Sequence, residues 1–352
     1  MKLNYKWTMK DDYPTEKNGL KVFSCFACGG GSTMGYKLAG FDVIGCNEID
    51  PKMNKVYVEN HNPKFNYLDG IQTFKLREDL PEELYDLDIL DGSPPCSSFS
   101  MSGNREKDWG KEKKFKEGQA EQVLDTLFFD FIDLAEKLKP KVVIAENVAG
   151  MLVGEAQSYV NKVLNEFNNA GYYVSYTLLD ASDMGVPQKR KRVFFTAVRK
   201  DLYQGHFVDL FQNEPALRLE FNEPKVNFSE IRSEEDDRPL SPIVKEYYEQ
   251  KIESESCMGE TTTRIDGKRK LFNQMYQKDN KVLYTLTAGE SVGAIVHPGR
   301  WINNSEIIKC SSFPSDYNFM KFKKAYICGM SVPPLMTARI ANEVKKQWLD
   351  KL

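Results

Sequence analysis

The sequence lacks several features that would assign a chain of this size to a class at once. Its formal net charge is −3, so no overall excess of positive charge indicates a nucleic-acid partner. No stretch is apolar enough for a membrane span, and the N-terminal MKLNYKWTMKDD contains no run suited to a signal peptide. The seven cysteines are odd in number and show no pairing pattern, which is typical of a reducing compartment. These absences predict a cytoplasmic protein that requires neither a membrane nor disulfides.

A metal site is also not expected. Cys25 and Cys28 have CxxC spacing, but no second pair has metal-ligand spacing, and a closed zinc site needs four ligands. Burial near a strand end is the better interpretation of this pair. The length of 352 residues predicts two domains, or one large domain with an insertion.

Short apolar runs alternate with helical patterns as far as about residue 205. The strongest helical pattern covers residues 123–138 and ends before Pro140, and Asp50-Pro51 marks another helix start. Such alternation predicts an α/β fold, with a doubly wound, mostly parallel sheet and helices on both faces. The predicted strands are LKVFSCF, FDVIGCNEID, YDLDILDG, KVVIAENV, YYVSYTLL and RVFFTAV.

Beyond that point the pattern becomes irregular. Residues 206–318 are rich in Asn, Glu, Lys and Pro, whereas PPLMTARIANEVKKQWL near the C-terminus is again helical. The sequence therefore predicts one domain over residues 1–205, completed by 319–352, and a smaller irregular domain over 206–318. A polar leader precedes the first strand.

A glycine turn, Cys28-Gly29-Gly30-Gly31, follows the first predicted strand, and Glu48 ends the second. Glycines let the backbone approach a ligand closely, and an acid at the end of the second strand can accept hydrogen bonds from ribose hydroxyls. The pattern predicts an adenosine-containing cofactor without choosing among NAD, FAD and S-adenosylmethionine. The spacing is not GxGxxG, and a purely structural glycine turn remains open.

Two prolines, Pro94 and Pro95, stand between a buried strand and Cys96. Proline fixes φ and removes a donor, so the chain leaves the sheet on a rigid path. Open α/β sheets bind ligands at the carboxyl ends of their strands. Because the Ser- and Gly-bearing stretch SSFSMSGN follows, Cys96 is predicted to be near solvent and reactive rather than buried and inert.

Polar groups at two other strand ends complete the candidate site. Glu146 lies at the end of KVVIAENV, where a partly desolvated carboxyl could hold or share a proton near pH 7; a helix-capping acid is the alternative. In VPQKRKRVFF, strand alternation would place Arg190 and Arg192 on one face. With Gln188 they suit a base edge or phosphates.

The order of these motifs resembles that of the cytosine-5 DNA methyltransferases of bacteria and phages. The motifs are FACGGGS, NEID, PPCSSFS, ENV, QKRKR, then RWINNSEIIKCSSFPSDY and GMSVPP. The resemblance spans roughly residues 20–340, apart from the irregular domain. The resemblance implies a Rossmann-like S-adenosylmethionine-dependent methyltransferase fold, with residues 206–318 as a target-recognition domain. It also implies methyl transfer from S-adenosyl-L-methionine, leaving S-adenosyl-L-homocysteine and using no metal. The acceptor would be C5 of a cytosine flipped out of a specific short duplex DNA sequence.

The resemblance assigns catalytic roles to five residues. Cys96 would add covalently to C6 and Glu146 would protonate or hydrogen-bond N3, which makes C5 nucleophilic. Arg192 would contact the base O2, Arg190 would support the same pocket or the backbone, and Pro95 precedes the nucleophile.

Two further regions would contact the DNA. A loop of about residues 97–117 would close over the flipped base, with Gly103, Gly110 and Gly118 as flexible points. Lys268–Lys270 would contact phosphates.

The cofactor site would be assembled from several motifs. Phe26 would make edge contact with the adenine, Gly29–Gly31 would hold the methionine moiety, and Glu48 would bind the ribose. The cofactor residues that the resemblance implies are Phe26, Ala27, Gly29, Gly30, Gly31, Glu48, Ile49, Asp69, Gly70, Ile71, Ser93, Pro94, Leu127, Ser331 and Val332.

This chain departs from the family pattern at four places. Cys28 replaces a glycine, and Asp69-Gly70-Ile71 has its aspartate shifted by one position, which puts its contact with the adenine amino group in doubt. Met330 replaces an asparagine, and Ser305 stands where an arginine is expected. Weaker binding of the cofactor is therefore expected, with the catalytic residues intact.

The implied partners are double-stranded DNA and, as a functional rather than physical partner, a cognate restriction endonuclease. The chain is expected to act as a monomer in a bacterial cytoplasm or a phage-infected host. Alternatives are an RNA (tRNA) cytosine-5 methyltransferase, a non-catalytic DNA-binding relic such as a repressor, and an NAD dehydrogenase, which would leave Cys96 without a role. The target sequence, and the base that removes the C5 proton, are not determined.

Overall fold

The computed structural model describes residues 3–95, 126–154, 156–202, 217–234, 238–271, 273–288 and 293–352. The chain divides into two compact units. The sheet unit consists of Tyr13–Leu179, Lys191–Glu220 and Thr337–Leu352. The smaller unit consists of Met1–Asp12, Asp180–Arg190 and Phe221–Met336.

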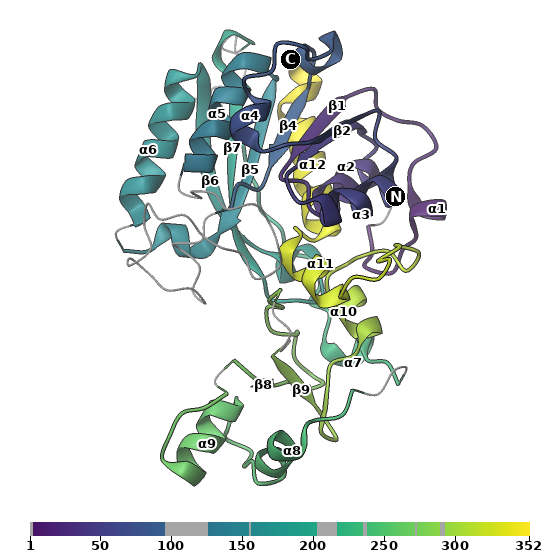
Figure 1. The fold of residues 1–352 in the computed structure, drawn as a ribbon, viewed down its shortest axis with the longest axis vertical. Helices are drawn as coiled ribbons and strands as arrows, with labels where there is room; N and C mark the ends of the chain where they lie inside the picture. The colour runs from purple at the N-terminus through teal and green to yellow at the C-terminus, as the bar shows by residue number, and fades with distance from the viewer. Residues whose placement is uncertain are drawn as a thin grey trace. The chain divides into compact units, whose positions relative to one another are not determined.

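A seven-stranded sheet organises the sheet unit, in the order β3-β2-β1-β4-β5-β7-β6 (Figure 1). Neighbours from β3 to β5 pair in parallel, whereas β5 and β7 are antiparallel. The predicted α/β class with a mostly parallel sheet is confirmed. The strands are β1 (Lys21–Cys25), β2 (Asp42–Glu48), β3 (Phe65–Leu68), β4 (Ile89–Gly92), β5 (Val142–Val148), β6 (Tyr172–Asp180) and β7 (Lys191–Arg199).

Helices cover both faces of this sheet because successive side chains of a strand point to opposite sides. Phe23 and Cys25 of β1 join the main apolar core with α4, α5 and α6. Ser24, between them, lies on the face where Tyr36 of α2 is buried. The α-helices in the described part of the unit are α2 (Gly31–Leu38), α3 (Pro51–His61), α4 (Ile71–Phe74), α5 (Leu127–Leu138), α6 (Ala156–Asn169) and most of α12 (Pro334–Gln347).

Helix boundaries follow the local sequence signals. Asp50 caps α3, since its carboxylate accepts hydrogen bonds from the backbone N–H of Lys52 (2.8 Å) and Met53 (3.4 Å), and Pro51 occupies the first helical position. Helix α5 ends at Leu138, before Pro140 as predicted. The C-terminal helical pattern forms α12.

Two parts of the fold differ from the sequence predictions. The short strand β3 was not predicted; it lies at the sheet edge and alternates half-buried and exposed residues. The N-terminal leader is not simply polar: Trp7 is 6% exposed, and its indole N–H donates to the Ser312 carbonyl oxygen at 2.8 Å. This buried indole packs the leader into the smaller unit, next to the helix α1 (Met9–Asp12).

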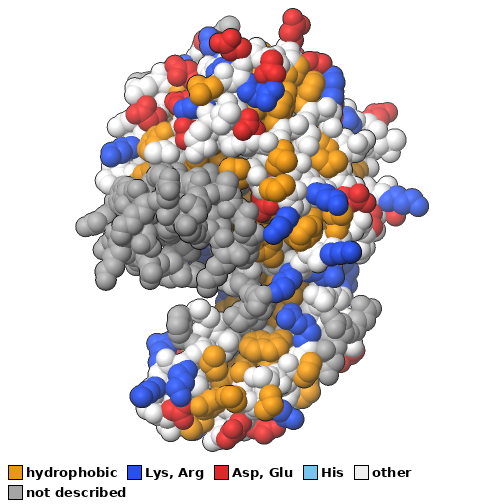
Figure 2. All heavy atoms as spheres, viewed as in Figure 1, with side chains coloured by type: hydrophobic (Ala, Val, Ile, Leu, Met, Phe, Trp, Pro, Cys, Tyr) orange, Lys and Arg blue, Asp and Glu red, His pale blue; other side chains and the backbone are white. Residues whose placement is uncertain are grey.

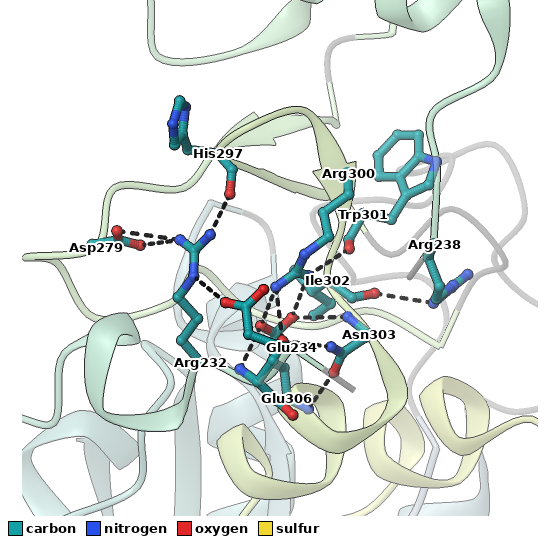
Figure 3. Close-up of polar contacts among 11 residues, drawn as sticks. Arg232, Glu234, Arg238, Asp279, His297, Arg300, Trp301, Ile302, Asn303 and Glu306 are labelled. Carbon is teal, nitrogen blue, oxygen red and sulfur yellow. Dashed lines mark hydrogen bonds and ion pairs between the residues drawn. The ribbon is translucent and has the colours of Figure 1, made fainter. Parts of the chain in front are cut away.

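The smaller unit contains a three-stranded sheet, β10-β9-β8, and short helices. A buried ion pair between Arg300 and Glu306 (2.7 Å) lies beside it, and Asn303 and Glu306 form a capping box at the start of α10 (Figure 3). Besides α1, the elements in its described residues are η5 (Ala181–Met184), α7 (Phe228–Ile231), α8 (Pro242–Glu249), α9 (Met258–Asp266), β8 (Met275–Tyr276), β9 (Ala294–Val296), β10 (Arg300–Trp301), α10 (Asn304–Cys310) and α11 (Lys324–Met330).

The bounds of the two units differ from those of the predicted domains. Residues 3–12, 180–190 and 319–336, assigned from sequence to the larger domain, cluster with the smaller unit, whereas residues 217–220, assigned to the irregular domain, cluster with the sheet unit. The role of residues 206–318 in target recognition remains a prediction. No helix in the described ranges is long and apolar enough to cross a membrane.

Candidate active site

The glycine turn joins β1 to α2 at the carboxyl edge of the parallel strands. Phe26, Cys28 and Gly30 have positive φ values of 53°, 46° and 82°. His61, the last residue of α3, lies directly under the turn, with its Nε2 3.3 Å from the Gly29 carbonyl oxygen. A Cβ added to Gly30 would lie 2.1 Å from that Nε2, so only glycine fits there. Burial lowers the pKa of His61 to about 3, so it supports the turn as a neutral ring.

Glu48 ends β2 beside this turn and is 7% exposed. Its carboxylate accepts hydrogen bonds from the backbone N–H of Cys28 (2.7 Å) and Asp50 (2.8 Å), and a third backbone bond comes from Ile49. Burial raises the pKa of Glu48, and these backbone donors oppose the rise. A carboxylate has about four acceptor sites, so the backbone leaves it room for one further donor, such as a ribose hydroxyl.

The shifted aspartate follows the next strand, β3. The backbone N–H of Asp69 donates to the Glu48 carbonyl oxygen at 3.2 Å, and its carboxylate lies 4.0 Å from an Arg77 guanidinium nitrogen. Gly70 precedes α4, whose first residue, Ile71, is 2% exposed. The motif therefore lies beside the Glu48 strand end, with its acid directed toward an arginine.

The remaining apolar residues predicted at the cofactor site differ in burial. Phe26 and Ile49 are half-buried, and the Phe26 ring lies 6.2 Å from that of Phe131. Ala27 is 8% exposed. Leu127 is fully buried within the main core, so its side chain packs against protein.

At the end of β4, Ser93, Pro94 and Pro95 lead toward the predicted nucleophile. The Asn147 side-chain amide donates to the Pro94 carbonyl oxygen at 3.0 Å and ties this turn to β5. Cys96 itself lies outside the described residues. The predicted closing loop of residues 97–117, with Gly103 and Gly110, and the third glycine, Gly118, also lie outside them.

A buried acid precedes this turn and was not singled out from sequence. Asp91 in β4 is 5% exposed and accepts hydrogen bonds from the Ser24 hydroxyl (2.8 Å) and the Tyr36 hydroxyl (3.1 Å). Burial raises its pKa to about 7; the hydroxyl donors oppose that rise and the charge of Glu146 adds to it. The signal available in the sequence was an acid inside the otherwise apolar run of β4.

Glu146 and Arg192 form an ion pair, with 2.8 Å between Arg192 Nε and Glu146 Oε1. Their side chains are 12% and 15% exposed. Because β5 and β7 are antiparallel, the end of one strand meets the start of the other, and Val148 pairs with Arg192. The structure thus brings these two predicted residues together, Glu146 from β5, which is adjacent to β4, and Arg192 from β7.

Arg190 and Gln188 have other surroundings. Strand β7 begins at Lys191, so the alternation expected to align Arg190 with Arg192 does not reach Arg190. Arg190 is 2% exposed and donates to three backbone carbonyl oxygens of the smaller unit, those of Leu286 (3.2 Å), Gly329 (2.9 Å) and Ser331 (3.1 Å). Gln188 is also buried and bonds to Leu286 and Cys310.

The last predicted cofactor residues, Ser331 and Val332, are both 4% exposed and belong to the smaller unit. Of the departures from the family pattern, Met330 is 47% exposed, whereas Ser305 is half-buried beside Glu306. Lys268–Lys270 are exposed, and Lys270 pairs with Asp266 at 2.8 Å. Within the described ranges, no group of three or more His, Cys, Asp or Glu residues could hold a metal ion.

One family model matches most of this chain. The family model described as C-5 cytosine-specific DNA methylase matches residues 20–346. The type II methyltransferase M.NgoPII of Neisseria gonorrhoeae is 36% identical over 195 residues, which is 55% of this chain and 52% of that protein. The type II methyltransferase M.Bsp6I of a Bacillus species is 28% identical over 94% of this chain and 100% of its own.

A solved structure supports the fold. A Spodoptera frugiperda DNMT2 variant matches with a TM-score of 0.62 and 17% identity, over 93% of this chain and 99% of its own.

The match to M.NgoPII, like that to M.FnuDI of Fusobacterium nucleatum (49%), covers only about half of the relative's length.

Proposed function

Because the chain belongs to the C-5 cytosine-specific DNA methylase family, we propose that it methylates C5 of a cytosine flipped out of duplex DNA. The observation that carries this proposal is the Glu146–Arg192 ion pair. Strands β4, β5 and β7 are neighbours, so the turn leading to Cys96, the acid and the guanidinium meet at one sheet edge. Acid, cation and thiol are the groups that a cytosine ring needs for activation.

S-adenosyl-L-methionine is the proposed methyl donor, and the residues present fit an adenosine-containing cofactor. The glycine turn, in which only glycine fits at position 30, follows β1. The buried Glu48 carboxylate ends the adjacent strand β2. Glu48 would accept a bond from the ribose, and Phe26 and Ile49 would offer apolar contact. When bound, this cofactor supplies an electrophilic methyl group and requires no metal.

Cytosine C5 is a poor nucleophile until C6 has been attacked. The Cys96 thiolate would add to C6 while Glu146 donates a hydrogen bond or proton to N3, which leaves C5 enamine-like. Arg192 would bind O2 of the base, and its positive charge would stabilise the Glu146 carboxylate that remains once N3 holds the proton. After C5 has gained the methyl group, a base such as water removes the C5 proton. The C5–H electron pair then forms the C5–C6 double bond, Cys96 leaves C6 as a thiolate, and the N3 proton returns to Glu146.

Trapping of the covalent adduct tests this mechanism. Duplex DNA carrying 5-fluorocytosine has no C5 proton to lose, so the wild-type protein should remain attached through Cys96. Cys96→Ala should abolish both trapping and methyl transfer and leave the fold intact. An active wild-type protein that forms no adduct at Cys96 would contradict the mechanism, and transfer to tRNA instead of duplex DNA would favour the RNA alternative.

The named relatives are type II methyltransferases, and from them we infer a short specific duplex target. A restriction endonuclease of the same specificity would be the functional partner. A monomer would suffice for such a target, since it can modify each strand in turn. Bisulfite sequencing of DNA from cells that express the chain would give both the activity and the target sequence.

A further inference from the structure

A groove in the smaller unit has no role in the proposed chemistry. Its volume is about 490 Å³, and it lies around the start of α11. We call it the basic groove, because among the described residues that line it four are cationic, none is acidic, and two are aromatic. The cationic residues are Arg238, Lys321, Lys323 and Lys324.

One wall is anchored through Arg238. Its carbonyl oxygen accepts a hydrogen bond from the backbone N–H of Trp301 at 2.8 Å, and its guanidinium donates to the Ile302 carbonyl oxygen at 3.3 Å (Figure 3). Both the backbone and the head group of this half-buried arginine are therefore tied to β10 and the residue after it. A held guanidinium loses little freedom when it binds an anion.

A second lining segment, which contains Ala288, is held by a buried arginine. Arg190 donates to the carbonyl oxygens of Leu286 and Gly329, and so joins the segment that contains Ala288 to the end of α11. A Cβ on Gly329 would lie 2.7 Å from the Ala288 backbone nitrogen, so the two segments are in close backbone contact. This packing holds Ala288, a lining residue of the groove, against α11, whose first residue is Lys324.

The lysines are presented to solvent on this framework. Lys321 and Lys323 are exposed, while Lys324 is half-buried, with its Nζ 5.7 Å from the centre of the Phe319 ring. Figure 2 shows Lys and Arg side chains gathered where Figure 1 places α10 and α11. Several cations on one held surface, without an acidic lining residue in the described chain, attract a ligand with repeated negative charge.

We propose that the basic groove binds phosphodiester groups of duplex DNA. The proposal rests on the proposed function, in which duplex DNA is the substrate. Cationic side chains on phosphates position a protein on the duplex without reading its sequence. The groove would thus contribute affinity equally to target and non-target DNA and add nothing to the methyl-transfer step.

The test is the salt dependence of DNA binding by the full chain without cofactor. Each phosphate contact steepens the plot of log binding constant against log salt by about 0.9. The triple variant Lys321→Gln/Lys323→Gln/Lys324→Gln should flatten this slope by between about one and three units. Its affinity for a duplex of random sequence should fall between about tenfold and a hundredfold at moderate salt, with the same factor for target DNA.

Two matched variants serve as controls. Lys52→Gln/Lys55→Gln/Lys162→Gln removes the same charge from exposed positions on α3 and α6 and should leave the slope close to wild type. Replacing the three groove lysines by arginine retains the charge and should retain the slope. An unchanged slope in the glutamine triple variant, or an equal change in the α3 and α6 variant, would overturn the proposal.

A free phosphate is the competing ligand source. Inorganic phosphate, compared with chloride at matched ionic strength, should displace DNA no more effectively from the wild type than from the triple variant. Phosphate-specific competition that disappears in the triple variant, with the DNA slope unchanged, would assign the groove to a small anion and overturn the DNA assignment. Absence of methyl transfer would instead count against the proposed function, because the binding assay does not depend on turnover.

Discussion

The sheet unit and the smaller unit each contain a short Arg–Glu ion pair, but the two pairs are enclosed differently. Arg192 and Glu146 lie at strand ends, with 15% and 12% of their side chains exposed, whereas Arg300 and Glu306 are 9% and 0% exposed. Glu306 also accepts hydrogen bonds from the backbone N–H of Asn303 and Ser233. A pair enclosed by backbone donors is suited to hold a fold, while a pair at an open sheet edge can exchange partners with a ligand.

The largest expected effect concerns the open pair. Glu146→Gln keeps the shape of the side chain but removes its proton chemistry and its charge for Arg192, so kcat for methyl transfer should fall between about 100-fold and 10,000-fold. The melting temperature should change little. Steady-state methyl transfer and thermal unfolding measure the two effects, and a variant that keeps near wild-type kcat would exclude Glu146 from catalysis.

The enclosed pair should behave in the opposite way. Glu306→Gln leaves the Arg300 charge buried without its partner, which costs about 3–5 kcal/mol of unfolding free energy. Methyl transfer per folded molecule should stay near wild type. Urea unfolding and active-site titration by adduct trapping separate the two quantities. A loss of less than about 1 kcal/mol would remove the distinction between the pairs.

Asp91 sharpens the comparison, because it is an enclosed acid within the sheet unit. Burial raises its pKa from 3.8 to about 7, so the folded chain keeps this proton at pH values where the unfolded chain has lost it. The folded state therefore binds more protons between about pH 4 and pH 7, and the unfolding free energy should decrease as pH rises through that range. The decrease from this group is at most about 4 kcal/mol and levels off above pH 7.

Unfolding in urea at a series of pH values measures this dependence. Asp91→Asn has no proton to lose and should show a flatter profile than the wild type between pH 4 and pH 7. Parallel profiles for the two proteins would mean that Asp91 titrates as an ordinary carboxyl.

The smallest effect compares two glycines of the sheet unit. Gly19 and Gly30 both have positive φ values, 78° and 82°, but only Gly30 has a side chain, His61, in the space of a Cβ. Gly19→Ala should cost about 1–2 kcal/mol for the left-handed backbone, and Gly30→Ala a further 1–3 kcal/mol or so for overpacking. Gly30→Ala should also weaken binding of S-adenosyl-L-methionine, measured by calorimetry, while Gly19→Ala should not. If the two variants bound S-adenosyl-L-methionine with equal affinity, the Gly30 turn would not be part of the cofactor site.

Local signals explain which parts of the fold could be predicted from sequence. The strands β1, β2, β4 and β5 each contain a short apolar run, and α3 begins at an aspartate followed by proline, so local sequence is enough to recognise them. Strand β3 escaped because it has only four residues and lies at the sheet edge, where alternate residues are exposed and the apolar run is too short to recognise. Trp7 escaped because its partner, Ser312, is distant in the sequence.

The candidate site also has features that local motifs predict and features that depend on residues far away in the sequence. Glu146 and Arg192 could be proposed from motifs at strand ends, and the pairing of β5 with β7 brings them together. The carbonyl contacts of Arg190 could not be read from strand alternation, because the strand begins one residue after it; its role in supporting the pocket or the backbone stays a prediction. Cys96 remains a sequence-based prediction.

The sequence by itself determined the α/β class, the family resemblance and the residue types available for chemistry, because these depend on local periodicity and on short motifs. Only the tertiary structure decided which charges are open and which are enclosed, since burial depends on residues far away in the chain. It made Asp91 a buried acid, gave Arg190 its carbonyl contacts, and gathered Arg238 with Lys321–Lys324 in one groove.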